Sequence, residues 1–154
     1  VCPDSLTVAW TNCNQPMKDI SRKYEERFYP ETFNDFAARM DWAADGIGNR
    51  NPVIVLDGTV SYMPVYVSVA AGSVINGDLS QSYDPDGDDV EYTWWLQGDA
   101  GTFEGSVDIQ VIDGISTISI PEEADGTEIH LICEARDDGE PSLVNYRRMV
   151  VTVN

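Results

Sequence analysis

Carboxylates alternate in one short acidic run, and a second acidic pair follows a later strand. The run Asp84-Pro85-Asp86-Gly87-Asp88 suits a tight turn, but its glycine falls at the fourth position, so it is not an EF-hand loop. Two loops at one end of a β-sandwich can together supply the hard oxygen ligands that Ca²⁺ prefers. The alternative is a solvated turn whose Asp side chains accept hydrogen bonds from their own backbone amides. The candidate calcium ligands are Asp84, Asp86, Asp88, Asp137 and Asp138.

An aromatic strand follows the acidic turn directly. Between Val90 and Gln97 the period of two places Tyr92 and Trp94 on one face and Trp95 on the other. An exposed indole usually has a partner, which leads to two interpretations. In one, Trp95 stacks on a sugar ring; in the other, this sheet face docks a helix. The candidate ligand-binding residues are Trp95, Tyr146, Arg148 and Glu91, and Tyr62 and Tyr66 form a second aromatic pair.

The residues give little support for catalysis. His130 is the only histidine and falls within a predicted strand, and no serine has a Gly-x-Ser-x-Gly surrounding. Acid pairs such as Glu122 and Glu123 are expected by chance among 27 acids. Phosphate-binding glycine loops and Cys/His zinc clusters are both missing from the sequence. We therefore predict no enzymatic activity.

The negative charge is concentrated in the second part of the chain. The formal net charge is −18; residues 1–51 hold 8 acids and 6 bases, whereas residues 52–154 hold 19 acids and 3 bases. Such a surface repels nucleic acid and anionic membranes, so we expect neither as a partner. With no apolar run near the roughly 20 residues needed to span a bilayer, we expect no membrane insertion. Cations and neutral polymers fit the charge better.

The three cysteines differ in their surroundings. Cys2 and Cys13 are close in an irregular segment, and a disulfide between them would indicate an oxidising compartment. Cys133 shares one face of a predicted strand with Leu131 and Ala135, which favours a buried free thiol.

The first 50 residues have helical spacing. Asn14 and Pro16 suit a helix start, and Pro30 is expected to divide the segment into two helices. In the second helix Phe33, Phe36 and Met40 recur at i, i+3 and i+7, and we expect this apolar stripe to pack on the sandwich.

From residue 51 the period changes to two. We therefore predict a mostly β fold, an immunoglobulin-like antiparallel β-sandwich over residues 51–154 with a short helical N-terminal extension over residues 1–50. The predicted strands are Val53–Leu56, Met63–Val69, Val74–Ser82, Val90–Gln97, Val107–Ile112, Ser116–Ile120, Thr127–Ala135 and Tyr146–Val153.

Several motifs, in this order, resemble a known family. The motifs are Phe33-Asn34-Asp35-Phe36-Ala37-Ala38-Arg39-Met40-Asp41-Trp42, Asn51-Pro52-Val53, the Asp84 to Asp88 turn, Tyr92-Thr93-Trp94-Trp95, Asp137-Asp138-Gly139-Glu140-Pro141 and Tyr146-Arg147-Arg148. Over residues 29–154 the chain is similar to the C-terminal domain of the bacterial cellulose-binding family that carries a nucleoside-hydrolase-like N-terminal domain. The Asp-Pro-Asp-Gly-Asp turn also resembles polycystic-kidney-disease and cadherin-like domains. Residues 1–28 match no part of these families.

The resemblance implies an extracellular, carbohydrate-associated module with an immunoglobulin-like fold. We therefore expect a secreted or cell-surface, non-catalytic polysaccharide-binding module of cellulose type. The alternative is a structural immunoglobulin-like subunit or packing domain of an extracellular assembly, which would self-associate or contact a hydrolase-like domain.

Overall fold

A single long helix precedes a β-sandwich. The computed structural model describes residues 15–154, so the predicted Cys2–Cys13 disulfide lies outside the described residues. In that part of the chain no helix has the length and apolar character to cross a membrane. The elements are α1 (Gln15–Asp45), β1 (Val55–Leu56), β2 (Thr59–Val60), β3 (Val65–Val69), β4 (Val74–Asp78), β5 (Val90–Leu96), η1 (Gly98–Ala100), β6 (Asp108–Ile112), β7 (Ile115–Ser119), η2 (Glu122–Ala124), β8 (Glu128–Asp137) and β9 (Val144–Val153).

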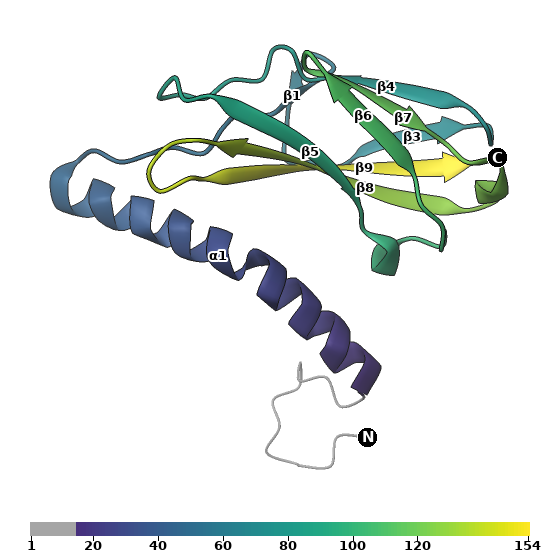
Figure 1. The fold of residues 1–154 in the computed structure, drawn as a ribbon, viewed down its shortest axis with the longest axis horizontal. Helices are drawn as coiled ribbons and strands as arrows, with labels where there is room; N and C mark the ends of the chain where they lie inside the picture. The colour runs from purple at the N-terminus through teal and green to yellow at the C-terminus, as the bar shows by residue number, and fades with distance from the viewer. Residues whose placement is uncertain (1–14) are drawn as a thin grey trace.

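Two sheets form the sandwich, and α1 runs along the outside of one of them (Figure 1). The larger sheet has the order β3-β9-β8-β5, and the smaller has the order β4-β7-β6. A short β1–β2 hairpin stands beside them. The fold is the predicted immunoglobulin-like sandwich with one N-terminal helix.

One strand pair departs from the antiparallel prediction. β3 pairs with β9 in parallel, with Val65 opposite Met149 and Val69 opposite Val153. The long excursion of the chain between the two strands, through the other sheet and back, allows this parallel pairing without a helical crossover. The other described strand pairs are antiparallel.

Asp-Gly dipeptides close two tight hairpins. Asp57-Gly58 joins β1 to β2, and Asp113-Gly114 joins β6 to β7; all four residues have positive φ between 51° and 78°. This is the backbone of a type I′ turn, which matches the twist of the flanking strands.

The core lies between the inner faces of the two sheets. In β8 the residues Ile129, Leu131, Cys133 and Ala135 are fully buried, which confirms the predicted face and the buried thiol. From the opposite sheet Ile118 of β7 is equally buried. Period-two side-chain alternation therefore sets which residues form the core.

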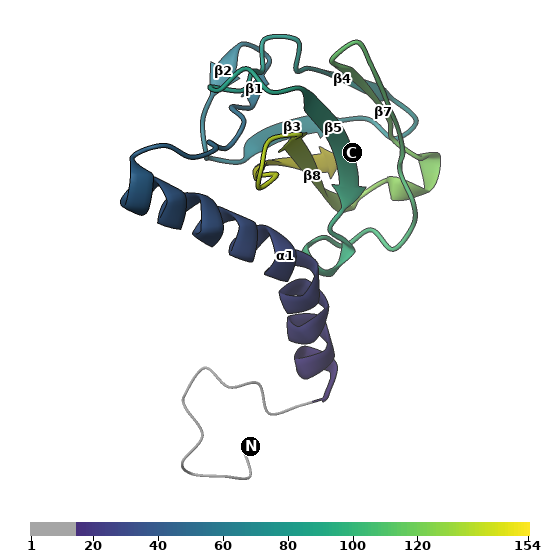
Figure 2. The same cartoon turned by 60° about the vertical axis from the view of Figure 1, so that its left-hand side comes forward.

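The prediction of two helices was wrong. Pro30 lies inside α1, which continues from Gln15 to Asp45 and bends near its middle in Figure 2. A proline within a helix removes one backbone hydrogen bond and pushes the preceding turn away, which produces a bend without ending the helix when other contacts hold both halves. Those contacts come from the sandwich, as described below.

The predicted packing face of the helix was also wrong. Phe33, Phe36 and Met40 are 53%, 59% and 47% exposed, whereas Ala38 is buried and Phe28 is half-buried. The helix docks through a face that mixes aromatic, small and polar residues, so its hydrophobic stripe points away from the sandwich.

Candidate functional site

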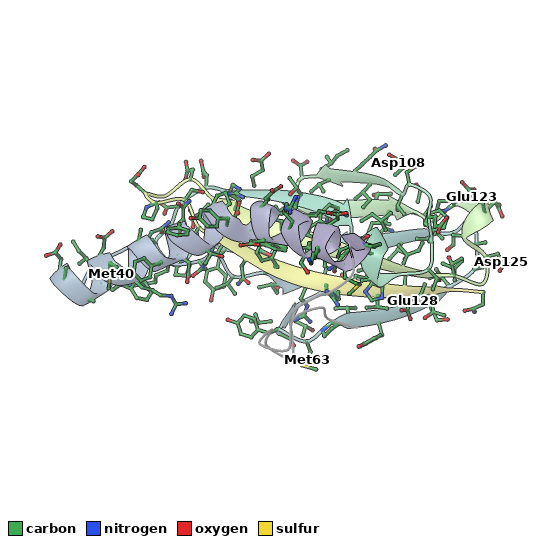
Figure 3. The ribbon with its side chains drawn as sticks, turned by 90° about the horizontal axis from the view of Figure 1, so that it is seen from below. Met40, Met63, Asp108, Glu123, Asp125 and Glu128 are labelled. Atoms are coloured by element: carbon green, nitrogen blue, oxygen red, sulfur yellow. The ribbon has the colours of Figure 1, made fainter. Side chains whose placement is uncertain are left out.

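Helix α1 covers the outer face of the four-stranded sheet where the predicted ligand-binding aromatics lie. The Phe28 ring packs edge-on against Tyr146 at a centroid distance of 5.4 Å and contacts Trp95 at 6.3 Å. The structure thus brings Trp95 and Tyr146 together, as predicted, but beneath the helix. Figure 3 shows α1 lying across this sheet.

Trp95 is enclosed by helix side chains. The Arg27 guanidinium carbon stands 4.0 Å from the centre of the indole, which is cation–π geometry. The indole Nε1 is buried and has no hydrogen-bond partner. Trp95 therefore contacts a docked helix, which was one of the two interpretations of this outward tryptophan, because Arg27 occupies the face of its ring.

Tyr146, Arg148 and Glu91 have separate surroundings. Burial, with the nearby carboxylates of Glu134 and Glu31, raises the pKa of Tyr146 to about 12. Arg148 donates a hydrogen bond from Nη2 to Gln97 Oε1 at 2.7 Å. Glu91 is exposed at the other end of β5, about 13 Å from Trp95 at the usual strand rise. The four candidate residues therefore do not form one site.

Three ion pairs between α1 and the sandwich complete the docking of the helix. Arg27 pairs with Glu134 at 3.1 Å, and Lys23 pairs with Asp99 at 2.6 Å. Nearer the middle of the helix Glu31 accepts a hydrogen bond of 2.6 Å from Arg136 of β8. These pairs fix which face of the helix meets the sheet, although each exposed pair contributes only about 0–1 kcal/mol.

The second aromatic pair is open to solvent. Tyr62 is 87% exposed and Tyr66, on the edge strand β3, is 75% exposed. Beside Tyr62 lies a shallow hollow that is also lined by Ser61, Asn145 and Tyr146. Sequence reasoning named both exposed tyrosines but missed Asn145, because nothing in the sequence pairs the start of β9 with the β2–β3 connection.

The predicted acidic residues meet at one end of the sandwich. Asp84 is 9% exposed, and its Oδ1 accepts hydrogen bonds from the backbone amides of Asp86, Gly87 and Asp88. These are the hydrogen bonds expected for the self-capping turn, which was the alternative to a calcium site. The backbone amide of Asp89 donates to the Asp138 carboxylate at 2.9 Å, which ties the two acidic loops together.

Asp137 organises the second loop from a buried position. It is 3% exposed, and its Oδ1 accepts hydrogen bonds from Asn49 Nδ2 at 3.1 Å, from the Gly139 amide at 3.1 Å and from the Leu143 amide at 2.8 Å. Asn49 also donates to the Pro141 carbonyl at 2.9 Å. Asn49 thereby links the end of the α1 segment to the loop between β8 and β9, and sequence reasoning did not find it.

Two carboxylate oxygens at this end are buried without a partner. They are Oδ2 of Asp84 and Oδ2 of Asp137. Desolvation and then the neighbouring carboxylates raise the pKa of Asp88, and burial raises the pKa of Asp137 above its ordinary value. Arg50 is the nearby cation and pairs with Asp86 at 3.6 Å. The cluster thus has excess negative charge.

The described residues form no preformed metal-binding site. Within residues 15–154 no group of three or more His, Cys, Asp or Glu side chains is arranged to bind an ion. The orphan oxygens of Asp84 and Asp137 suit a hard cation chemically, and a third carboxylate would have to move toward them.

Among residues 15–154, His130 and Cys133 are the remaining side chains with a potentially reactive imidazole or thiol. His130 Nε2 lies 2.9 Å from Glu128 Oε1 on the outer face of β8, and its ring is half-buried. Burial raises the pKa of the Cys133 thiol to about 12, so the thiolate is not formed at neutral pH.

Comparison with known proteins settles the family. The family model described as "Cellulose-binding protein Sde0182, C-terminal domain" matches residues 74–153, which is more than half of the chain. The chain belongs to this family. The matched residues include both acidic loops and strands β4 to β9, which make up the smaller sheet and three of the four strands of the larger sheet.

One similar solved structure extends the match into α1. It is a nucleoside hydrolase-related hypothetical protein from Saccharophagus degradans, associated with carbohydrate metabolism; identity is 38% and the TM-score 0.78. The match covers 83% of this chain, about 128 residues, whereas residues 51–154 number only 104. Part of α1 is therefore shared. The chain spans 32% of the relative's length.

More distant structures share 14–18% identity. Titin domain M7 has 14% identity and a TM-score of 0.41, with 69% of this chain and 96% of that chain covered. Mouse PcdhgC3 EC1-3 has 18% identity and a TM-score of 0.39, with 68% and 33% covered. No curated protein matches the chain.

Proposed function

We propose that this domain is a non-catalytic, extracellular or cell-surface module that binds polysaccharide of the cellulose type. The observation that carries the proposal is the pair Tyr62 and Tyr66, which present two nearly free aromatic rings on the edge of a sandwich from a family described as cellulose-binding. A tyrosine ring offers an apolar face to the axial C–H groups of a pyranose and a hydroxyl to its rim.

We propose Tyr62 and Tyr66 as the sugar-binding residues in place of Trp95 and Tyr146, which the helix covers. Trp95 and Tyr146 would have to lose Phe28 before a sugar ring could stack on them, whereas Tyr62 is accessible and borders the hollow with Asn145. In this proposal Trp95 anchors α1, and Arg148 and Glu91 do not orient the sugar.

Affinity at such a surface is expected to be weak. Two exposed rings bury little area, and the cost of losing translational freedom is the same as for a larger contact. A polymer compensates because it offers many equivalent positions to a single module. The formal net charge of −18 does not oppose binding to a neutral polymer.

The proposal is tested by retention on insoluble cellulose and on other insoluble polysaccharides. We expect wild-type protein to be retained, the Tyr62→Ala/Tyr66→Ala double variant to be released, and Tyr83→Ala to behave as wild type. Tyr83 is a matched control because it is 53% exposed on a different loop. Equal retention of the double variant would refute the proposed platform, and no retention on any polysaccharide would refute the function.

We further propose that Ca²⁺ binds the acidic end and stiffens the Asp84 to Asp88 and Asp137 to Asp138 loops. The support is the pair of buried, unpartnered oxygens on Asp84 and Asp137 and the raised pKa of Asp88. The melting temperature of wild type should rise with Ca²⁺ and return after chelation, and that of Asp84→Asn/Asp88→Asn should not respond. A wild-type melting temperature that Ca²⁺ leaves unchanged would exclude the site.

A further inference from the structure

The outer face of α1 carries a continuous apolar stripe. We call Tyr29, Phe33, Phe36 and Met40 the outer stripe; they are 57%, 53%, 59% and 47% exposed. Steps of four, three and four residues keep them on one side of a helix. The rings of Tyr29 and Phe33 pack at a centroid distance of 4.5 Å, so this part of the stripe is a formed surface. Exposed apolar stripes of this kind mark interaction surfaces.

The sandwich does not provide the partner for the outer stripe. The opposite face of α1 already docks on the larger sheet through Phe28 and Glu31, and Ala38 on that same face is buried. Because the helix is held on that side, it cannot roll to bury Phe33 and Phe36 without breaking the Glu31–Arg136 ion pair.

A partner of suitable size exists in the solved relative. The match with the S. degradans protein covers only 32% of that chain, so about two thirds of it lies outside the match. The family is described as a C-terminal domain, which places the unmatched part of that protein before the matched part. The match includes part of α1, so in that protein the helix joins the sandwich to the preceding part.

We propose that the outer stripe is the seat of a second domain attached on the N-terminal side of α1, of the kind that precedes the matched part of the nucleoside hydrolase-related S. degradans protein. A tethered domain meets the stripe at a high effective concentration, so an interface as small as one helix face suffices. A second copy of this chain is a poorer occupant because each copy carries a net charge of −18. The seat is separate from Tyr62 and Tyr66, so it goes beyond the proposed function.

Methionine oxidation can test the seat with an internal control. Met40 belongs to the outer stripe, and Met63, 70% exposed, lies near the tyrosine pair; Figure 3 labels both. Hydroxyl-radical footprinting would compare this chain alone with a full-length S. degradans protein whose matched part is replaced by residues 15–154. In the chimera we expect oxidation of Met40 and Phe33 to slow about tenfold, as at the water-excluded core of an interface, and that of Met63 to stay unchanged.

A double variant separates docking from misfolding. In the chimera, Phe33→Ser/Phe36→Ser should restore the oxidation rate of Met40 to that of the chain alone, with Met63 still unchanged. Equal oxidation of Met40 in the chain and the chimera would overturn the proposal. Two results with the chain alone would also overturn it. Protection of Met40 that grows with protein concentration would indicate that a second copy covers the stripe, and protection on adding cellulose would indicate that the stripe binds sugar. Loss of cellulose retention in the tyrosine variants leaves this result unaffected.

Discussion

Phe28 should hold α1 on the sandwich, and its removal gives a quantitative test. A fully buried phenylalanine loses about 3–5 kcal/mol on truncation to alanine, and Phe28 is only half-buried. Its two ring contacts with the sheet, to Trp95 and to Tyr146, contribute about 0.5–1.5 kcal/mol each beyond burial. We therefore expect Phe28→Ala to weaken docking of the helix by about 2 kcal/mol.

Amide hydrogen exchange measures this docking directly because it reports local opening. A change of about 2 kcal/mol corresponds to roughly thirtyfold faster exchange across residues 24–38. Phe33→Ala is the matched control: it makes the same change of residue type on the exposed face and should shift the docking free energy by less than about 0.5 kcal/mol. Equal exchange in the two variants, or less than a threefold change in Phe28→Ala, would refute the reasoning.

Three further predictions concern the sandwich itself. Asp137→Ala should lower the free energy of unfolding by about 3 kcal/mol in urea titrations because three donors lose their acceptor, whereas Asp137→Asn, which keeps an acceptor oxygen, should change it by less than about 1 kcal/mol. Folding raises the pKa of Asp88 and Asp137, so the folded state binds protons more tightly than the unfolded state. The melting temperature should therefore rise as the pH falls from 7 toward the ordinary Asp range near about 4, and Asp88→Asn should flatten that rise. If the variant has the same slope of melting temperature against pH as wild type, this explanation is contradicted. Ser116→Ala should cost about 1–2 kcal/mol of unfolding free energy because Trp94 Nε1, which donates to Ser116 at 2.8 Å, loses its partner; a cost below about 0.5 kcal/mol would show that water replaces the hydroxyl.

Alternation along strands was enough to predict the core. The period of two placed Trp94 inside and Trp95 outside, and it placed Leu131 and Cys133 on the buried face of β8; the structure confirms both assignments. These predictions hold because a strand has two faces, and a single buried face fixes all its side chains. Pairing between distant strands has no such local signal, which is why the parallel β3–β9 pair was not predicted.

The docking face of α1 was predicted wrongly because the prediction used hydrophobicity alone. The strongest stripe, around Phe33 and Phe36, was assigned to the only partner visible in the sequence. The face that docks combines the single aromatic Phe28 with ion pairs and the small, buried Ala38, and ion pairs and small residues add little to a hydrophobic periodicity. The acidic residues were grouped correctly because Asp-rich turns carry their own local geometry, but their anchor, Asn49, gives no signal in the sequence.

The most direct test of the central claim is a titration of ¹⁵N-labelled protein with a soluble cellulose oligosaccharide, followed by amide chemical shifts. The proposed function predicts saturable shifts that cluster at Tyr62, Tyr66 and Asn145 and disappear in the Tyr62→Ala/Tyr66→Ala variant. An absence of shifts at saturating sugar, or shifts confined to the outer stripe of α1, would contradict it.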